Sequence, residues 1–283
     1  IPLRLVGSEM CIRDSKGLDW LCSLIIKNYG DLNHKINFVQ SLRSSEDYIY
    51  KHVLNVAILS AIIAGQMGFP VGRINLLVKS AILHDIGALK LQQLPDAEDL
   101  DDGTKEVVKK NTQETLDRYG DLDEEVLRLI TQMQELYTRE SDAEIPAGLK
   151  ESVNANILYV ADAYDRMTAM KSFEEPTSEV KAVRELLADE ERYNKKIVNA
   201  LIHGISILYP GVCVELSNGE KGLVITENED NIFEPTVLDF RNNNLYDLSD
   251  PSVKQTIEIA DVMKTMDNRI KLDKSLLEEY QAN

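Results

Sequence analysis

The sequence is poor in cysteine. Its three cysteines, Cys11, Cys22 and Cys213, lie among 283 residues, and no CxxC pair or paired spacing connects them. Disulfide-rich secreted domains and zinc knuckles both need such pairs, so we expect neither a disulfide framework nor a zinc knuckle. Unpaired cysteines are usual in a reducing compartment, and we therefore expect a cytoplasmic protein.

Basic residues are also scarce relative to acidic ones. The chain has 31 Lys and Arg against 48 Asp and Glu, which gives a formal net charge of −17. An acidic protein repels polyphosphate, so DNA and RNA are not expected as partners. No apolar run reaches the roughly 18 residues of a membrane span, so no membrane segment is expected. The charge still allows a small anionic ligand that a metal ion or a local basic group holds.

The first 15 residues differ from the rest of the chain. Arg4 to Ser15 reads RLVGSEMCIRDS, which looks like the translation of a sequencing-library adapter. We expect residues 1–15 to be such an artefact with no part in the fold, and a natural segment to have preceded residue 16. No basic region followed by an apolar run, as in a signal peptide, is found after it.

The main positive feature of the sequence is a long series of helical patterns. Apolar residues recur at helical spacing from Gly17 to about His203. The segments Tyr48–Met67 and Ile74–Ile86 are apolar nearly all round, which is typical of buried helices. Gly87 stands where a C-terminal cap of the second segment belongs. The predicted helices are 18–29, 48–67, 74–86, 104–119, 121–140, 152–170 and 178–205, the last with one break.

The composition shifts after this helical part. Short β-like runs cover Val212–Leu216, Gly222–Thr226 and Thr236–Phe240, and Asn218-Gly219 predicts a tight turn between the first two. We therefore predict a mainly α protein with a small C-terminal β appendage. The predicted boundaries are 16–207 for the helical domain, 208–245 for the β appendage of two or three strands, and 246–283 for an acidic, partly helical tail.

Four polar side chains lie inside the most apolar helical segments. His52 opens one apolar helix, His84 and Asp85 follow each other near the end of the next, and Asp162 lies within ANILYVADAYDRM. A buried carboxylate is costly unless it is paired, hydrogen-bonded or bound to a metal. Histidine nitrogens and carboxylate oxygens together form a ligand set for Mn, Fe, Ni, Zn or Mg ions. Three separate helices could bring these four groups to one ion.

Each of these residues also has an ordinary structural interpretation. His52 alone could be a surface histidine at the start of a helix, and Asp85 could cap a neighbouring helix. Asp162 could pair with Arg166 one helical turn later. Asp165, three residues after Asp162, could lie behind the ligands or at the surface. On spacing alone, a metal site and a set of structural pairs are equally compatible with the sequence.

The order of these residues resembles the HD phosphohydrolase superfamily, and in particular a degenerate form of its HD-GYP branch of cyclic di-GMP phosphodiesterases. The resemblance rests on four pieces of the sequence between about residues 18 and 240. They are Tyr50-Lys-His-Val-Leu-Asn-Val-Ala57, Ala81-Ile-Leu-His-Asp-Ile-Gly87, Ile157-Leu-Tyr-Val-Ala-Asp-Ala-Tyr-Asp-Arg-Met-Thr168, and the β segment from Tyr209-Pro-Gly211 to Gly222-Leu-Val224.

The resemblance implies an HD-domain helical bundle with a metal centre. Carried over residue by residue, His52, His84, Asp85 and Asp162 would be ligands of a single divalent ion, and Asp85 would be the catalytic carboxylate able to bridge a further ion. The ion would make a bound water acidic enough to attack a phosphodiester. The substrate implied is a nucleotide or a cyclic dinucleotide similar to cyclic di-GMP.

Several positions depart from the pattern of that branch. Ala88 stands in place of a phosphate-contacting lysine, and Lys90, two residues later, is the candidate substitute. The Asp-Gly-x-Gly-Tyr-Pro loop is missing from 139–145. The other positions with a different residue are Asn111, Met133, Gln134 and Asn156. All these departures concern additional metals or substrate binding, whereas the four ligands of the first metal are kept.

Two functions therefore stay open. The first is a divergent, mononuclear metal-dependent phosphohydrolase. The second is a catalytically inactive regulatory module that binds a nucleotide or a signalling protein partner.

Overall fold

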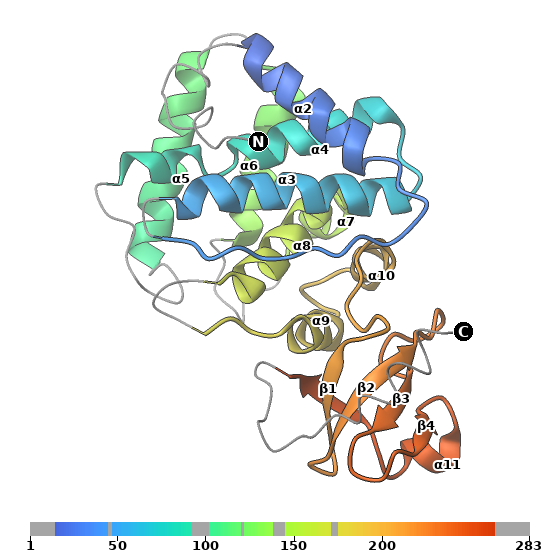
Figure 1. Ribbon diagram of the computed structural model, residues 1–283. Helices are drawn as coiled ribbons and strands as arrows, with labels where there is room; N and C mark the ends of the chain where they lie inside the picture. Colours follow the sequence, from blue (N-terminus) through green and yellow to red (C-terminus); the bar gives the residue numbers. More distant parts are fainter. Residues whose placement is uncertain are drawn as a thin grey trace. The chain divides into compact units, whose positions relative to one another are not determined.

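The computed structural model describes residues 15–44, 47–91, 102–119, 122–137, 145–170 and 175–263. The chain divides into two compact units, one formed by Ile1–Thr177 with Ala182–Ser206 and the other by Ser178–Lys181 with Ile207–Asn283. The first unit is helical and the second contains the β-sheet (Figure 1). This confirms a mainly α protein with a C-terminal β part. The adapter-like residues 1–14, the acidic loop at 92–101 and the segment 138–144 lie outside the described residues.

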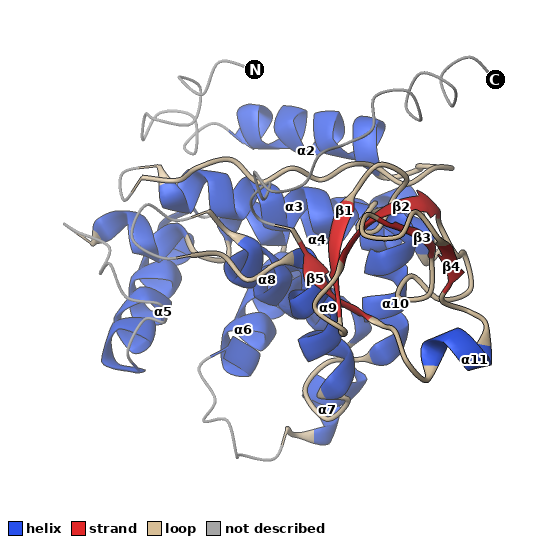
Figure 2. Ribbon diagram, turned by 60° about the horizontal axis from the view of Figure 1, so that its bottom comes forward, coloured by secondary structure: helices blue, strands red, loops and turns tan. Residues whose placement is uncertain are grey.

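The helical unit is built around α3 (Tyr48–Gln66). This helix packs against α2, α4, α8 and α10, and Figure 2 shows it among the other helices. Its apolar residues are buried on nearly every side, as the sequence predicts. The bounds of the other helices are α2 (Ser15–Tyr29), α4 (Val71–Leu83), α5 (Asp102–Leu116), α6 (Glu124–Tyr137), α7 (Ala147–Glu151), α8 (Val153–Thr168), α9 (Glu179–Ala188) and α10 (Lys195–Gly204). The predicted break in 178–205 is the connection between α9 and α10.

By length and composition, α3 is the one helix of the described residues that could cross a membrane. This corrects the expectation that no apolar segment is long enough. The core helix of a protein passes the same test, and 61% of its most apolar window is buried inside the protein. The helix also carries the buried His52 and Ser60. We therefore describe α3 as the central helix of the bundle.

The end of α4 differs from the prediction of a helix over 74–86 capped by Gly87. The helix ends at Leu83, and a 3-10 helix, η2, covers Ile86–Lys90. His84 and Asp85 thus lie at the junction of the two. Gly87 is buried within η2 and its N–H donates to Thr112 Oγ1 at 3.0 Å. A Cβ atom at Gly87 would lie 2.3 Å from both Thr112 N and Val108 O, so this glycine permits close packing on α5 rather than capping a helix.

Substitution Gly87→Ala is expected to lower the free energy of unfolding by about 1–3 kcal/mol, because backbone atoms of α5 must move to admit the methyl group. The matched control is Gly148→Ala in α7, where an added Cβ meets no atom within 4 Å. The control should be neutral or slightly stabilising, since alanine favours a helix over glycine. Urea unfolding of both variants measures the difference, and equal stability would contradict the packing role.

The β unit is a five-stranded antiparallel sheet with the order β4-β3-β2-β1-β5. The strands are β1 (Cys213–Leu216), β2 (Lys221–Thr226), β3 (Thr236–Asp239), β4 (Leu245–Asp247) and β5 (Ile259–Val262). The Asn218-Gly219 turn is confirmed, with Gly219 at φ +82°. The first three strands match the predicted runs, and the sheet gains β4 and β5 at its two edges.

Strand β5 lies in the segment 246–283, for which the sequence predicts a partly helical tail. That segment also contains the short helix α11 (Pro251–Lys254), and residues 264–283 lie outside the described residues. Four residues in an acidic stretch carry too short a pattern to predict a strand. Pairing with β1, with Val214 opposite Val262, supplies the hydrogen bonds that define it.

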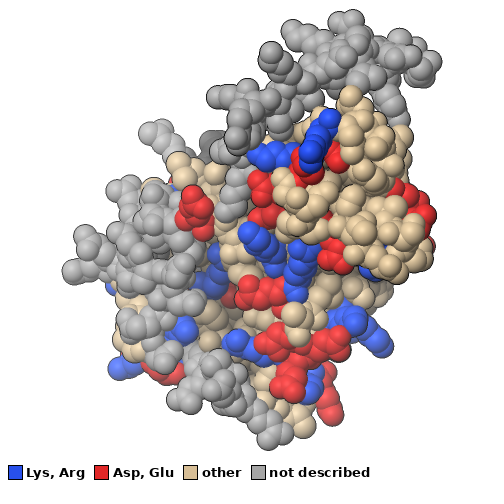
Figure 3. Space-filling view, turned by 90° about the horizontal axis from the view of Figure 1, so that it is seen from below, with Lys and Arg blue, Asp and Glu red and all other residues tan. Residues whose placement is uncertain are grey.

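The charged side chains on the face shown in Figure 3 are of both signs. Within the described part of that face, Lys and Arg lie among Asp and Glu, and no continuous basic patch is seen.

Candidate metal centre

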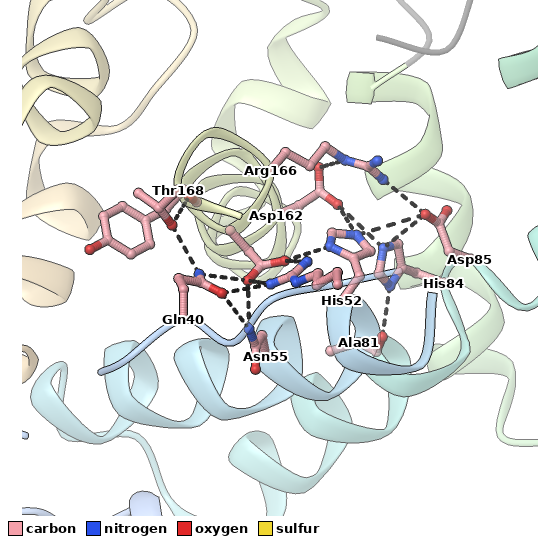
Figure 4. A network of polar contacts seen from close by, with 12 residues as sticks. Gln40, His52, Asn55, Ala81, His84, Asp85, Asp162, Arg166 and Thr168 are labelled. Atoms are coloured by element: carbon pink, nitrogen blue, oxygen red, sulfur yellow. Dashed lines mark hydrogen bonds and ion pairs between the residues drawn. The ribbon is translucent and has the colours of Figure 1, made fainter. Parts of the chain in front are cut away.

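Three helices bring the four predicted ligand residues together in the helical unit. His52 lies in the first turns of α3, His84 and Asp85 directly follow α4, and Asp162 lies in α8. All four are buried. Asp162 Oδ1 is 2.9 Å from His52 Nε2 and 3.4 Å from His84 Nε2. Asp85 Oδ2 is 3.8 Å and 3.6 Å from the same two nitrogens (Figure 4).

The nitrogen His84 Nε2 is the most informative atom of this cluster. His84 Nδ1 donates to the carbonyl of Ala81 at 2.7 Å, so the neutral ring keeps a lone pair on Nε2. Among the described residues, buried Nε2 has no hydrogen-bond partner. Burial opposes a positive charge on His84, but Asp85 and Asp162 outweigh it and raise its pKa. The site therefore favours a cation at this point.

The spacing of these atoms fits a metal ion. Ligand atoms about 2.1 Å from one ion lie about 3.0–3.4 Å apart at right or tetrahedral angles. The four contacts around Asp162 Oδ1 and Asp85 Oδ2 are close to this range. His52, His84 and Asp85 each offer a ligand atom within 4.8 Å of the others and could hold an ion.

Asp165 fixes the ring of His52 from behind. Its Oδ2 accepts from His52 Nδ1 at 2.8 Å, which directs Nε2 toward Asp162. A carboxylate behind a histidine is a common arrangement at metal centres. Asp165 is fully buried, so the surface interpretation is wrong, and its carboxylate lies behind His52. Burial alone would raise its pKa, but hydrogen bonds from His52 and Arg43 hold that pKa far below its usual range.

The sequence did not indicate the other partners of Asp165. Arg43 binds both carboxylate oxygens, with Nη1 at 2.8 Å and Nη2 at 2.6 Å. Asn55 and Gln40 donate to Oδ1 at 2.8 and 3.0 Å. Arg43 and Gln40 lie in the irregular segment before α3, where no periodicity reports which side chains turn inward. Their neighbours Val39 and Leu42 are exposed, so hydrophobicity predicts the opposite orientation.

Arg166 joins the two carboxylates on the other side of the cluster. Its Nε lies 2.9 Å from Asp162 Oδ2, which confirms the predicted pair one turn apart on α8. Its Nη2 also lies 2.8 Å from Asp85 Oδ2, a contact the sequence did not suggest. Burial would raise the pKa of Asp162, but Arg166 and the two histidines lower it well below its usual value. Against the effect of burial, the charges of His84 and Arg166 also lower the pKa of Asp85, so both carboxylates are ionised at neutral pH.

Lys90 is not brought to this cluster. Its Nζ contacts the carbonyl of Asn111 at 3.2 Å and Glu114 at 3.8 Å, on α5. Lys90 has no contact with the four predicted ligand residues, and its role in substrate binding stays a prediction. Gln134 donates to the carbonyl of His84 at 3.0 Å, and Asn156 donates to Leu149 O and Ser152 O. These residues hold the backbone around the cluster.

Residues 49–167 match the family model of the HD domain. The matched segment contains all four predicted ligand residues. Over part of its length the chain is also similar to two cyclic di-GMP phosphodiesterases.

Two curated relatives support this relationship. The chain is 22% identical over 201 residues to the cyclic di-GMP phosphodiesterase PA4108 of Pseudomonas aeruginosa, covering 69% of this chain and 49% of that protein. It is 24% identical over 234 residues to the cyclic di-GMP phosphodiesterase PdeB of Borreliella burgdorferi, covering 78% and 60%. The chain thus spans half to three fifths of the length of these relatives.

A solved structure also aligns with the chain. It is Bd1817, a HDG"Y"P protein from Bdellovibrio bacteriovorus, with a TM-score of 0.45 and 16% identity over 67% of this chain and 63% of that one.

Proposed function

We propose that this protein is a metal-dependent phosphohydrolase that cleaves a phosphodiester in a nucleotide or cyclic dinucleotide. The observation that carries the proposal is the buried His84 Nε2, which faces Asp85 and Asp162 and has no hydrogen-bond partner among the described residues. The distant relationship to cyclic di-GMP phosphodiesterases supports the substrate class.

The proposed ligands are His52, His84, Asp85 and Asp162. A divalent ion bound there supplies a Lewis acid for the phosphoryl group and lowers the pKa of a bound water. Asp165 holds His52 in the tautomer whose Nε2 carries no proton, and the carbonyl of Ala81 does the same for His84. Since both orienting bonds are buried, the two imidazoles are held in place before any ligand binds.

A second function is favoured by one observation. Arg166 already neutralises much of the charge of Asp85 and Asp162. The cluster can therefore be part of a folded bundle without catalysis, as a regulatory module that binds a nucleotide or a protein partner. Both functions use the same fold, and they differ in whether the protein hydrolyses a phosphodiester.

The test is metal loading followed by an assay of hydrolysis. The protein is stripped with a chelator, reconstituted separately with Mn, Fe, Ni, Zn and Mg, and incubated with bis(p-nitrophenyl) phosphate and with cyclic di-GMP. His84→Gln removes a proposed ligand. His203→Gln is the matched control, because His203 is exposed in the last turn of α10, where its Nδ1 contacts Asn199 O.

The hydrolase proposal predicts one bound ion per chain and turnover, both lost in His84→Gln and kept in His203→Gln. Binding of cyclic di-GMP without turnover under every metal would support the regulatory module instead. Absence of bound metal in the unaltered protein after all five reconstitutions would contradict the metal centre.

A further inference from the structure

The guanidinium of Arg166 occupies one side of both proposed ligand carboxylates. Asp162 directs Oδ1 toward the two histidines and Oδ2 toward Arg166 Nε. Asp85 Oδ2 accepts from Arg166 Nη2 at 2.8 Å while lying 3.6 Å from His84 Nε2 (Figure 4). Asp162 thus faces the imidazole nitrogens with one oxygen and Arg166 with the other, whereas the same oxygen of Asp85 faces both.

We infer that the guanidinium of Arg166 takes the place of a second cation and so limits this centre to a single metal ion. This inference rests on the proposed function. Two-ion centres hold their ions about 3.5–4 Å apart and join them through shared ligands. A shared carboxylate gives one oxygen to each ion. The second oxygen of Asp162 is taken by Nε of Arg166, and Asp85 Oδ2 is taken by Nη2.

The arginine is held rigidly in this position. It lies one turn after Asp162 on the same face of α8, so the pair needs no loop to form it. Its planar fork directs separate N–H donors at two acceptors at once. The guanidinium also lies over the ring of Tyr137, 4.5 Å from its centroid, and the side chain is only 17% exposed. A competing ion would have to displace all three contacts.

The charge balance agrees with one ion. Asp85 and Asp162 carry two negative charges, which one divalent ion neutralises, and the histidines are neutral when they act as ligands. Arg166 then leaves the centre with one positive charge, which matches the single negative charge of a phosphodiester. Asp165 does not alter this count because Arg43 pairs with it. A second divalent ion beside Arg166 would leave a large excess of positive charge in a buried site.

The inference is tested by counting Mn(II) ions in the full chain and in two variants. Arg166→Gln removes the charge and keeps much of the volume, and Arg166→Lys keeps the charge. Each protein is loaded with Mn(II), dialysed, and analysed by mass spectrometry for metal content and by electron paramagnetic resonance for exchange coupling between two ions. Circular dichroism verifies that each variant is folded.

We expect one uncoupled ion per chain in the unaltered protein and in Arg166→Lys, and a second, exchange-coupled ion in Arg166→Gln. A coupled pair in the unaltered protein would overturn the inference without any variant. One ion in all three proteins would also overturn it, although the metal centre would stand. No ion in the unaltered protein but one in Arg166→Gln would also overturn the inference, because the arginine would then replace the only metal ion. No ion in any of the three proteins would instead contradict the proposed function.

Discussion

Asp85→Asn is expected to remove the bound metal ion and to lower the rate of phosphodiester hydrolysis at least about 100-fold. Loss of a residue that only supports a metal ligand lowers activity by up to about 100-fold, and loss of a ligand should cost at least as much. Asp85 Oδ2 lies near His52 Nε2, His84 Nε2 and Arg166 Nη2. Asparagine keeps the size of the side chain but removes the charge that a divalent ion needs. The amide also presents N–H donors to a cluster that requires acceptors.

The fold should survive this substitution. Arg166 keeps its contact with Asp162 at 2.9 Å, so its charge stays paired. Asp230→Asn, at an exposed position of the β unit, is the matched control and should leave metal content and turnover unchanged. Metal content by mass spectrometry and initial rates of hydrolysis measure both variants. Full metal occupancy in Asp85→Asn would remove this residue from the ligand set.

Arg43→Met is expected to lower the free energy of unfolding by about 3–5 kcal/mol, the usual cost of breaking a buried ion pair from one side. The side chains of Arg43 and Asp165 are both 0% exposed. Without the guanidinium, the Asp165 carboxylate keeps its negative charge in the core with fewer donors. The orientation of His52 depends on the same carboxylate, so metal affinity should fall about 10–100-fold as well.

The matched control is Arg128→Met on α6, whose surface pair with Glu125 is 3.5 Å long and exposed, and which should change stability by no more than about 0.5 kcal/mol. The double variant Arg43→Met with Asp165→Asn removes both charges. It should be less destabilised than the sum of the two single changes, because no unpaired charge stays in the core. Chemical unfolding of the four proteins gives this coupling, and strict additivity would show that the pair contributes nothing.

Acid unfolding should report the same interaction. The folded pKa of Asp165 lies far below its unfolded value of about 3.9. Its contribution to stability is therefore complete above that unfolded pKa and is lost as the pH falls through the folded one. In Arg43→Met the folded pKa rises toward the unfolded one, so this contribution should be smaller. Its loss should still begin at the unfolded pKa but should be complete at a higher pH than in the unaltered protein. Stability curves between pH 2 and 6, compared with those of Arg128→Met, measure the shift.

The helices and the position of the centre were predictable because both leave local patterns in the chain. The burial of α3 follows from apolar residues on all its faces, and the four buried residues of the cluster stood out as polar groups within apolar segments. The pair between Asp162 and Arg166 was predictable because four residues bring two side chains together on a helix.

Helix α4 ends earlier than the sequence predicted, and the sheet has two strands that the sequence did not predict. Gly87 was expected to cap a helix, but its close contact with the backbone of α5 explains its position, and that contact lies 25 residues away in the chain. Strand β5 is defined by hydrogen bonds to β1 rather than by its own four residues. In both places the decisive partner lies far along the sequence.

The proposed ligands were chosen from local sequence patterns, whereas the side chains that hold them in place contact them from distant positions in the sequence. Arg43 reaches Asp165 across 122 residues, Asn55 reaches it across 110, and Arg166 reaches Asp85 across 81. A single sequence reports the spacing of side chains along one helix or strand, because that spacing repeats with the backbone. The pairing of charges between separate elements depends on how the bundle packs, and only the folded chain brings those charges within hydrogen-bonding distance.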